Sequence, residues 1–361
     1  MTGALPIAAP VREGGRLASA HGLVVFSALA LLIAALLSVS IGPTGITLAS
    51  LPRVLTALAT GQHDAASARE QLVLLDIRLP RLLLGAFVGA ALALSGAMMQ
   101  GMFRNPLADP TLIGVSSGAA LAAVATIALG NGLAAPFTKA FGVYALPFAA
   151  FVGGVSTTLA LVMIVGRQGQ LAVGTLLLAG IAIGALSMAL TGLISYASDD
   201  RELRDLTLWM LGSLSGASWP KVLAVLPFAL LVVLALPGLV RALNGLLLGE
   251  AEAFHLGIDV DRAKRAIILV AAAAVGAAVA VAGVVGFVGI VVPHLIRLAA
   301  GPDHRVVLPG SALLGATLVL LADIVARMLL RPAELPLGVV MALIGAPVFL
   351  HMVVKRGVGG S

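Results

Sequence analysis

The stretch LLLGAFVGAALALSGAMMQG, Leu82 to Gly101, carries no charged side chain over its whole length. An α-helix needs roughly 20 mainly apolar residues to cross the hydrocarbon core of a bilayer. Within the stretch, Gly85, Gly89, Ala93 and Gly96 recur about one helical turn apart. Small residues at this spacing let membrane helices approach one another closely. The stretch therefore predicts a tightly packed membrane-spanning helix.

The rest of the chain has the same apolar character. Of its 361 residues, 60% are hydrophobic and 11% are charged, whereas roughly a quarter of a soluble protein is charged. Ten apolar runs are candidate spans: 22–41, 82–103, 111–130, 144–165, 172–196, 220–240, 265–284, 286–300, 306–329 and 336–354. We therefore expect an all-α polytopic membrane protein, with a cytoplasmic tail over residues 1–20 and a single transmembrane domain over residues 21–356.

Local signals refine two of these helices. Asp109 is a typical N-cap residue and Pro110 suits the first position of a helix, so the third span should begin there. Gly283, Gly286 and Gly289 repeat the small-residue spacing of the first stretch and predict another close helix contact.

The composition excludes several kinds of chemistry. There are no cysteines, so disulfides and thiolate ligands are excluded. No GxxxxGK[ST] phosphate loop is present, and the six histidines have no metal-site spacing. His294 follows Pro293 inside a span and is interpreted as a packed helix-end residue rather than a ligand. We expect no catalytic residue, metal or bound cofactor, and no nucleic-acid partner, because the basic residues form no stripe.

The orientation of the bundle is weakly indicated by charge. If the N-terminus lies in the cytoplasm and the spans alternate, the 22 Lys and Arg residues divide twelve inside to ten outside. This small bias suggests that some of the outer arginines have a role of their own.

The segment Ser198 to Gly216 is too short and too charged to span a membrane. Its acidic start, Asp199 to Asp205, suits a helix N-terminus because the helix dipole favours negative charge there. We expect a half-inserted helix over about residues 199–212 on the outer side.

The segment GEAEAFHLGIDV, Gly249 to Val260, interrupts the apolar chain on the cytoplasmic side. It predicts a short amphipathic helix that Gly257 ends in a left-handed cap. Ala253, Phe254 and Leu256 are expected to form one apolar patch. Two interpretations are open at this point: a solvated helical loop, or a rigid knob that fits a groove on a soluble partner.

Several ordered stretches between about residues 72 and 354 resemble the FecCD-type permeases, the membrane subunits of ABC importers for iron-siderophores, haem and cobalamin. They are IRLPRLLLGAFVGAALALSGAMMQGMFRNPLADPTLIGVSSGAA, LLLAGIAI, LWMLGSLSGASW, LLLGEAEAFHLGIDVDRAKR, GFVGIVVPHLIRL, DHRVVLPGSALLGA, LADIVAR and PAELPLGVVMALIGAPVFL. The resemblance implies a homodimer in the bacterial inner membrane, with two cytoplasmic subunits that bind ATP–Mg and a periplasmic solute-binding protein.

The resemblance also implies roles for named residues. The coupling helix, about residues 249–257, would seat in the ATPase through Glu250, Ala251, Phe254, His255, Leu256 and Gly257. The docking arginines for the binding protein would be Arg78, Arg81 and Arg327. For all three, anchoring of a helix end at lipid head groups is the alternative. For Arg327, neutralisation by Asp323 one turn away is another.

The resemblance further implies two cytoplasmic gates and a transport pathway. One gate matches Asn105 and Leu107, and the other falls at Val173 and Gly174, where relatives can carry small hydroxyl residues. The pathway candidates are Met188, Thr191, Leu208 and Leu211.

The cargo is interpreted as haem, with ferric siderophore and cobalamin as alternatives. An ion-coupled secondary transporter is the competing class, and it is disfavoured because Asp323 is the only acid near a span and Arg327 lies beside it.

Overall fold

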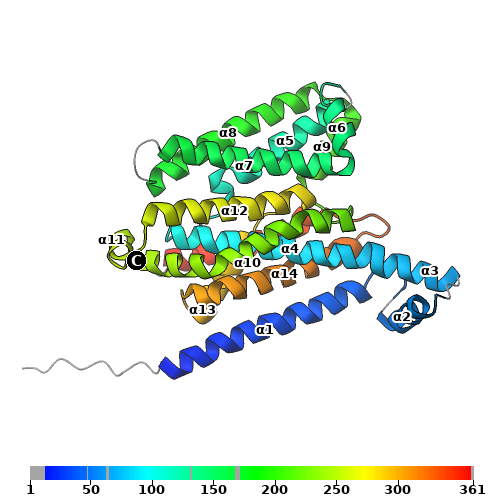
Figure 1. Ribbon diagram of the computed structural model, residues 1–361, viewed down its shortest axis with the longest axis horizontal. Coiled ribbons are helices and arrows are strands. Elements are labelled where there is room, and N and C mark those ends of the chain that lie inside the picture. The colour runs from blue at the N-terminus through cyan, green and yellow to red at the C-terminus, as the bar shows by residue number, and fades with distance from the viewer. Residues whose placement is uncertain (1–12, 47, 62–64, 131, 167–170, 359–361) are drawn as a thin grey trace, which may run out of the picture.

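The computed structural model describes residues 13–46, 48–61, 65–130, 132–166 and 171–358, so the first twelve residues of the expected tail lie outside it. All regular elements in these ranges are helices (Figure 1). Seven helical segments there are long and apolar enough to cross a membrane, and three apolar helices are shorter. The all-α polytopic fold is confirmed.

The helices of the bundle are α1 (Glu13–Ser40), α4 (Leu79–Met102), α5 (Val115–Leu129), α7 (Ala145–Gly166), α8 (Val173–Ala197), α10 (Trp219–Leu248), α12 (Val260–Ala282), α13 (Val288–Ala300), α14 (His304–Met328) and α15 (Leu337–Val358). The smaller helices are α2 (Leu51–Thr60), α3 (Ala65–Gln71), α6 (Ala135–Phe141), α9 (Asp200–Met210) and α11 (Glu250–His255).

These helices lie roughly side by side in layers (Figure 1). The helices α5, α7 and α8 form a group on one side of α12, whereas α14, α13 and α1 lie on the other side of α4 and α10. One end of the bundle carries α11 and the start of α1, and is called the α11 end. The opposite end carries α2, α3, α6 and α9, and is called the α9 end.

Helix α4, which contains the stretch that opened the sequence, is at the centre of the bundle. It packs against α10, α12, α13 and α14, and its methionines Met98 and Met99 are fully buried. A Cβ atom at Gly89 would lie 2.2 Å from the carbonyl oxygen of Gly315, and one at Gly96 would lie 1.9 Å from that of Gly289. The absence of these side chains is what lets the backbones meet.

The second small-residue pattern does not behave as predicted. Residues 283–287 form a non-helical connection between α12 and α13, in which Gly283 and Phe287 have φ values of 69° and 68°. Gly283 and Gly286 therefore belong to this turn, and only Gly289 lies in a helix and packs against α4.

The predicted start of the third span also shifts. Asp109 does accept a hydrogen bond from the Thr111 N–H, at 2.8 Å, but only a 3₁₀ turn, Pro110–Ile113, follows. Gly114 ends that turn with a φ of 76°, and α5 begins at Val115. A left-handed glycine thus separates the cap from the helix it was expected to start.

Helix α4 is preceded by more helix than the apolar pattern indicated. The helix α3 and a π-helical segment, Leu72–Arg78, run directly into it, so that residues Ser67–Met102 form one continuous helical span. The change from π- to α-helical bonding falls beside Pro80, which has no backbone N–H to donate.

The expected half-helix forms as α9. Asp199 caps it and, with Glu202, makes a reciprocal capping box, with the Glu202 N–H donating to the Asp199 carboxylate at 2.7 Å. Its acidic first turn is stabilised by the helix dipole, as the sequence indicated.

Candidate functional site

The helix α11 is a rigid projection at one end of the bundle. Gly249 precedes it with a φ of 124°, and Gly257 follows it with a φ of 79°, the left-handed cap that the sequence predicted. Ala253 is fully buried, beside Gly245 of α10. Phe254 and Leu256 are 69% and 63% exposed.

The expected patch is therefore divided, because Ala253 points into the bundle while Phe254 and Leu256 point away from it. Ala251 and His255 are also exposed. A groove of about 780 Å³ lies along this projection, and Glu250, Phe254 and Gly257 line it together with residues 258–261. Exposed apolar side chains on a capped helix beside a groove are suited to docking a protein partner.

The two predicted gate segments lie near α11. Asn105 is exposed in the turn after α4, and its side-chain oxygen accepts a hydrogen bond from the Leu107 N–H at 3.0 Å. Val173 and Gly174 form the first turn of α8. A cavity of about 330 Å³ is lined by Met102, Phe103, Arg104, Leu171, Ala172, Val173, Glu250 and Lys264. This cavity brings the end of α4, the start of α8 and α11 together.

The pathway candidates fall into two groups. Met188 on α8, Leu208 on α9 and Leu211 just after α9 are exposed. Thr191 is buried on the packed side of α8, in line with Ser187 and Gly180. The role of all four residues in a pathway stays a prediction, and Thr191 does not share the exposure of the other three.

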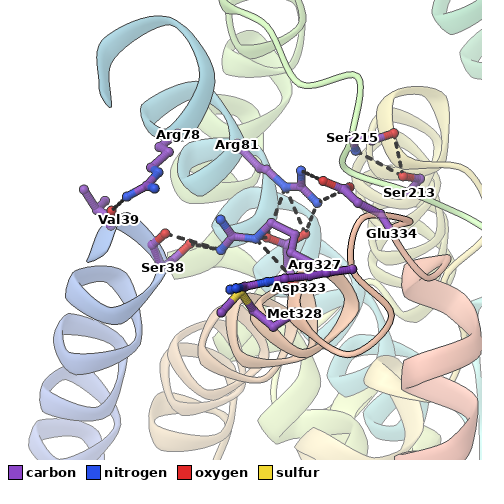
Figure 2. Close-up of polar contacts among 11 residues, drawn as sticks. Ser38, Val39, Arg78, Arg81, Ser213, Ser215, Asp323, Arg327, Met328 and Glu334 are labelled. Atoms are coloured by element: carbon purple, nitrogen blue, oxygen red, sulfur yellow. Dashed lines mark hydrogen bonds and ion pairs between the residues drawn. The ribbon is translucent and has the colours of Figure 1, made fainter. Parts of the chain in front are cut away.

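The predicted docking arginines lie at the α9 end, and all three are buried. Figure 2 shows their polar contacts. Arg81 donates to the carboxylate of Asp323 from Nε and Nη2, at 3.1 Å and 2.9 Å from Oδ1. It also donates to both carboxylate oxygens of Glu334, at 3.0 Å and 2.9 Å. Bidentate pairs of this kind are among the stronger polar contacts in proteins.

Arg327 and Arg78 complete the arginine cluster, defined as Arg78, Arg81, Asp323, Arg327 and Glu334. Arg327 Nε lies 3.1 Å from Asp323 Oδ2, so the ion pair considered for it from the sequence is formed. Arg78 donates to the carbonyl oxygens of Val39 and Ile46 and to the Thr44 hydroxyl. The three guanidinium groups are therefore engaged within the chain, and docking by them remains a prediction.

The sequence did not single out two of the residues that organise these regions. Glu334 closes the arginine cluster from the loop after α14, and its side chain is 33% exposed. Lys264 links α11 to the start of α8. Neither has a local signal, because each partner lies far away in the chain or in another element.

A buried polar group at the α11 end was also missed. The His304 main-chain N–H donates to the side-chain oxygen of Asn244 at 2.9 Å, and the His304 Nδ1 lies 2.9 Å from the same oxygen. Arg297 lies 3.3 Å from the other ring nitrogen and also binds the Gln100 side chain. These residues tie α10, α13, α14 and α4 together, and His294, predicted to be packed, is buried on α13. In the described part of the chain, no group of three or more His, Cys, Asp or Glu could hold a metal ion.

The family model of the FecCD transport family matches residues 30–355. The chain belongs to this family. The FecCD assignment agrees with the apolar helical bundle and with the ordered stretches quoted from the sequence.

Several relatives are similar over most of their length. The chain is 46% identical to the hemin transport system permease HmuU of Yersinia pestis, over 78% of this chain and 83% of the relative. It is 43% identical to the cobalamin import system permease BtuC of Halobacterium salinarum, over 85% and 80%. It is 45% identical to the vitamin B12 import system permease BtuC of Vibrio parahaemolyticus, over 81% and 86%.

A solved structure gives the same picture for the fold. It is an inward-facing conformation of a metal-chelate type ABC transporter, with a TM-score of 0.79 and 35% identity. The similarity covers 93% of this chain and 99% of the other. The FecCD chain is thus a multi-span permease of the ABC type.

Proposed function

We propose that this FecCD permease is the membrane subunit of an ATP-driven importer in the bacterial inner membrane, with its N-terminus in the cytoplasm. The observation that carries the proposal is α11, a capped helix that holds Phe254 and Leu256 exposed beside a groove. In a homodimer, each of two ATP-binding subunits, which carry ATP–Mg, would seat on one copy of this helix through Glu250, Ala251, Phe254, His255, Leu256 and Gly257.

The proposed assembly is a homodimer that receives cargo from a periplasmic binding protein. The arginine cluster is positioned for this at the α9 end, opposite α11 (Figures 1 and 2). Because the guanidinium groups of Arg81 and Arg327 are already paired, an acidic partner would have to exchange its carboxylate for that of Glu334, the exposed member of the cluster.

The proposed cargo is haem, with ferric siderophore and cobalamin as the alternatives. Support comes from the similarity to a hemin permease and to vitamin B12 permeases. The exposed side chains of Met188, Leu208 and Leu211 are apolar, and a pathway must hold its cargo weakly if the cargo is to leave.

The ion-coupled alternative relied on Asp323. That carboxylate is paired with both Arg81 and Arg327, which makes it a poor site for a coupling ion.

The test is reconstitution of the permease with its ATPase in liposomes. Uptake and ATP hydrolysis are followed with binding protein that is loaded with haem, loaded with ferric siderophore, or empty. We expect uptake that requires ATP and loaded binding protein, fastest with haem. Deletion of residues 249–257 should abolish ATPase binding and uptake while the bundle still folds. Accumulation by the permease alone, or normal uptake after the deletion, would contradict the proposal.

A further inference from the structure

Lys264 is the fifth residue of α12 and carries a buried charge. Its side chain is only 3% exposed. The ammonium group lies 2.7 Å from Glu250 Oε2, on the first residue of α11, and donates to the carbonyl oxygen of Leu171 at 2.9 Å. A buried cation is tolerated only when it is paired and hydrogen-bonded, so both contacts are needed to hold it there.

Leu171 is held from both sides by the same turn of α12. Its N–H donates to the carboxylate of Asp261 at 3.3 Å, while its carbonyl oxygen accepts from Lys264. Its side chain is fully buried. Ala172 follows and accepts the first hydrogen bond of α8, from the Leu176 N–H. The start of α8 is therefore fixed to α12 through the backbone of one residue.

The geometry makes Lys264 the direct polar link between α11 and the start of α8. Glu250 and Lys264 line the same cavity as Ala172 and Val173, so no other element separates them. A displacement of α11 moves the Glu250 carboxylate, and the buried ammonium must follow it or lose its ion partner. The Leu171 carbonyl, and with it the first turn of α8, is attached to that ammonium.

We propose that Lys264 is the positioning residue that transmits movement of α11 to the first turn of α8, where Val173 and Gly174 form the predicted gate. This inference rests on the proposed function, since it assumes that an ATPase moves α11. A purely structural brace would fix α8 equally but would not respond to ATP.

The first experiment uses the permease alone. The chain has no cysteine, so Ala172→Cys provides a single site for a nitroxide label. We expect greater label mobility in Glu250→Gln and Lys264→Met than in the labelled parent. The matched control is Glu252→Gln, which removes an exposed carboxylate from the same helix without touching Lys264. Unchanged label mobility in both test variants would overturn the proposed Lys264 link between α11 and α8, whether or not the chain is an importer.

The second experiment uses the complete transporter in liposomes. On addition of ATP, we expect the label signal to change in the parent, in Glu252→Gln and in Lys264→Arg, which keeps the cation. In Glu250→Gln and Lys264→Met the ATP-dependent change should fall several-fold. In Lys264→Met, which lies outside the predicted ATPase contact, ATP hydrolysis should continue and the cargo transported per ATP should fall several-fold. The double variant should be no worse than Lys264→Met, because residues of one contact are not additive.

The outcomes separate the two proposals. If the labelled parent neither hydrolyses ATP nor takes up cargo, the proposed function fails. The mobility measurement on the permease alone still shows whether Lys264 links α11 to α8. If the parent transports but Glu250→Gln keeps the parent's label response and cargo per ATP, transmission through Lys264 is wrong. Glu250 is half exposed and the Gln substitution is isosteric, and the first experiment contains no ATPase, so the label mobility of Glu250→Gln tests the contact with Lys264 even if Lys264→Met does not assemble.

Discussion

At the scale of single residues, the arginine cluster shows how charge is accommodated at the edge of an apolar bundle. Arg81 and Arg327 share the buried carboxylate of Asp323, and Glu334 satisfies the rest of the Arg81 guanidinium. The cluster joins α4, α14 and the loop after α14. We therefore expect it to act first on the stability of the α9 end, and on docking only through its exposed side.

The substitution Arg81→Ala should lower the free energy of unfolding by about 3–5 kcal/mol, because it leaves a buried carboxylate without one of its partners. The control is Arg53→Ala, which breaks an exposed pair with Glu70 in which the Arg53 side chain is 62% exposed. Such pairs contribute only about 0–1 kcal/mol. Denaturant unfolding in detergent measures both. Equal effects of the two substitutions would contradict the structural role of the cluster.

The opposite effect on stability is expected for Phe254, because its side chain is exposed. The substitution Phe254→Ala should leave unfolding nearly unchanged and weaken ATPase binding by about 2 kcal/mol, the loss typical of a buried aromatic anchor. Binding is measured by titrating the ATPase onto labelled permease. Leu133→Ala, an exposed residue between α5 and α6 at the α9 end, is the control. If Phe254→Ala bound the ATPase as tightly as Leu133→Ala does, Phe254 would not be part of the ATPase contact.

At the scale of helices, the packing of α4 depends on backbone contact rather than on side-chain fit. The substitution Gly96→Ala would place a Cβ 1.9 Å from the Gly289 carbonyl oxygen. Overpacking of this kind costs about 1–3 kcal/mol. Gly238 lies inside α10 with no atom within 4 Å of an added Cβ, so Gly238→Ala should be neutral or stabilise by up to about 1 kcal/mol. Denaturant unfolding of both variants measures the change in the free energy of unfolding, which should fall for Gly96→Ala and not for Gly238→Ala. A similar change in both would contradict the close contact at Gly96.

The helices were predictable from sequence where the signal is local. Apolar length indicated ten spans, the acidic turn indicated α9, and the polar segment that ends at Gly257 indicated α11. The pattern failed where the backbone leaves the helical region at Gly114 and at residues 283–287, since apolar composition continues through both turns. It also gave no sign of the π-helical segment before α4.

The site was only partly predictable, for a related reason. Phe254 and Leu256 are adjacent to the cap that exposes them, so a short window of sequence is enough to predict their exposure. The partners of Arg81 lie 242 and 253 residues away in the chain. Those of Lys264 lie in two other elements. The packing of the bundle decides which charged groups pair, and a pattern in a single sequence does not contain that information.

At the scale of the whole molecule, α11 and the start of α1 occupy one end of the bundle, and α6 and α9 occupy the other (Figure 1). With the N-terminus in the cytoplasm and the permease expressed without its ATPase, a cysteine introduced by Leu256→Cys should react with a membrane-impermeant maleimide only after spheroplasts are permeabilised. Leu133→Cys should react in intact ones, because it lies at the α9 end. The lack of native cysteines makes each label unique. The reverse pattern of labelling would invert the orientation.

The glycine contacts of α4 restrict which parts of the bundle can change their relative positions. Gly89 meets Gly315 of α14 and Gly96 meets Gly289 of α13, backbone against backbone. Sliding along such a contact would force carbonyl oxygens into neighbouring main chain, so α4, α13 and α14 should move as one rigid body. Opening and closing of the permease would then move helices outside this body, such as α5, α7 and α8, relative to it.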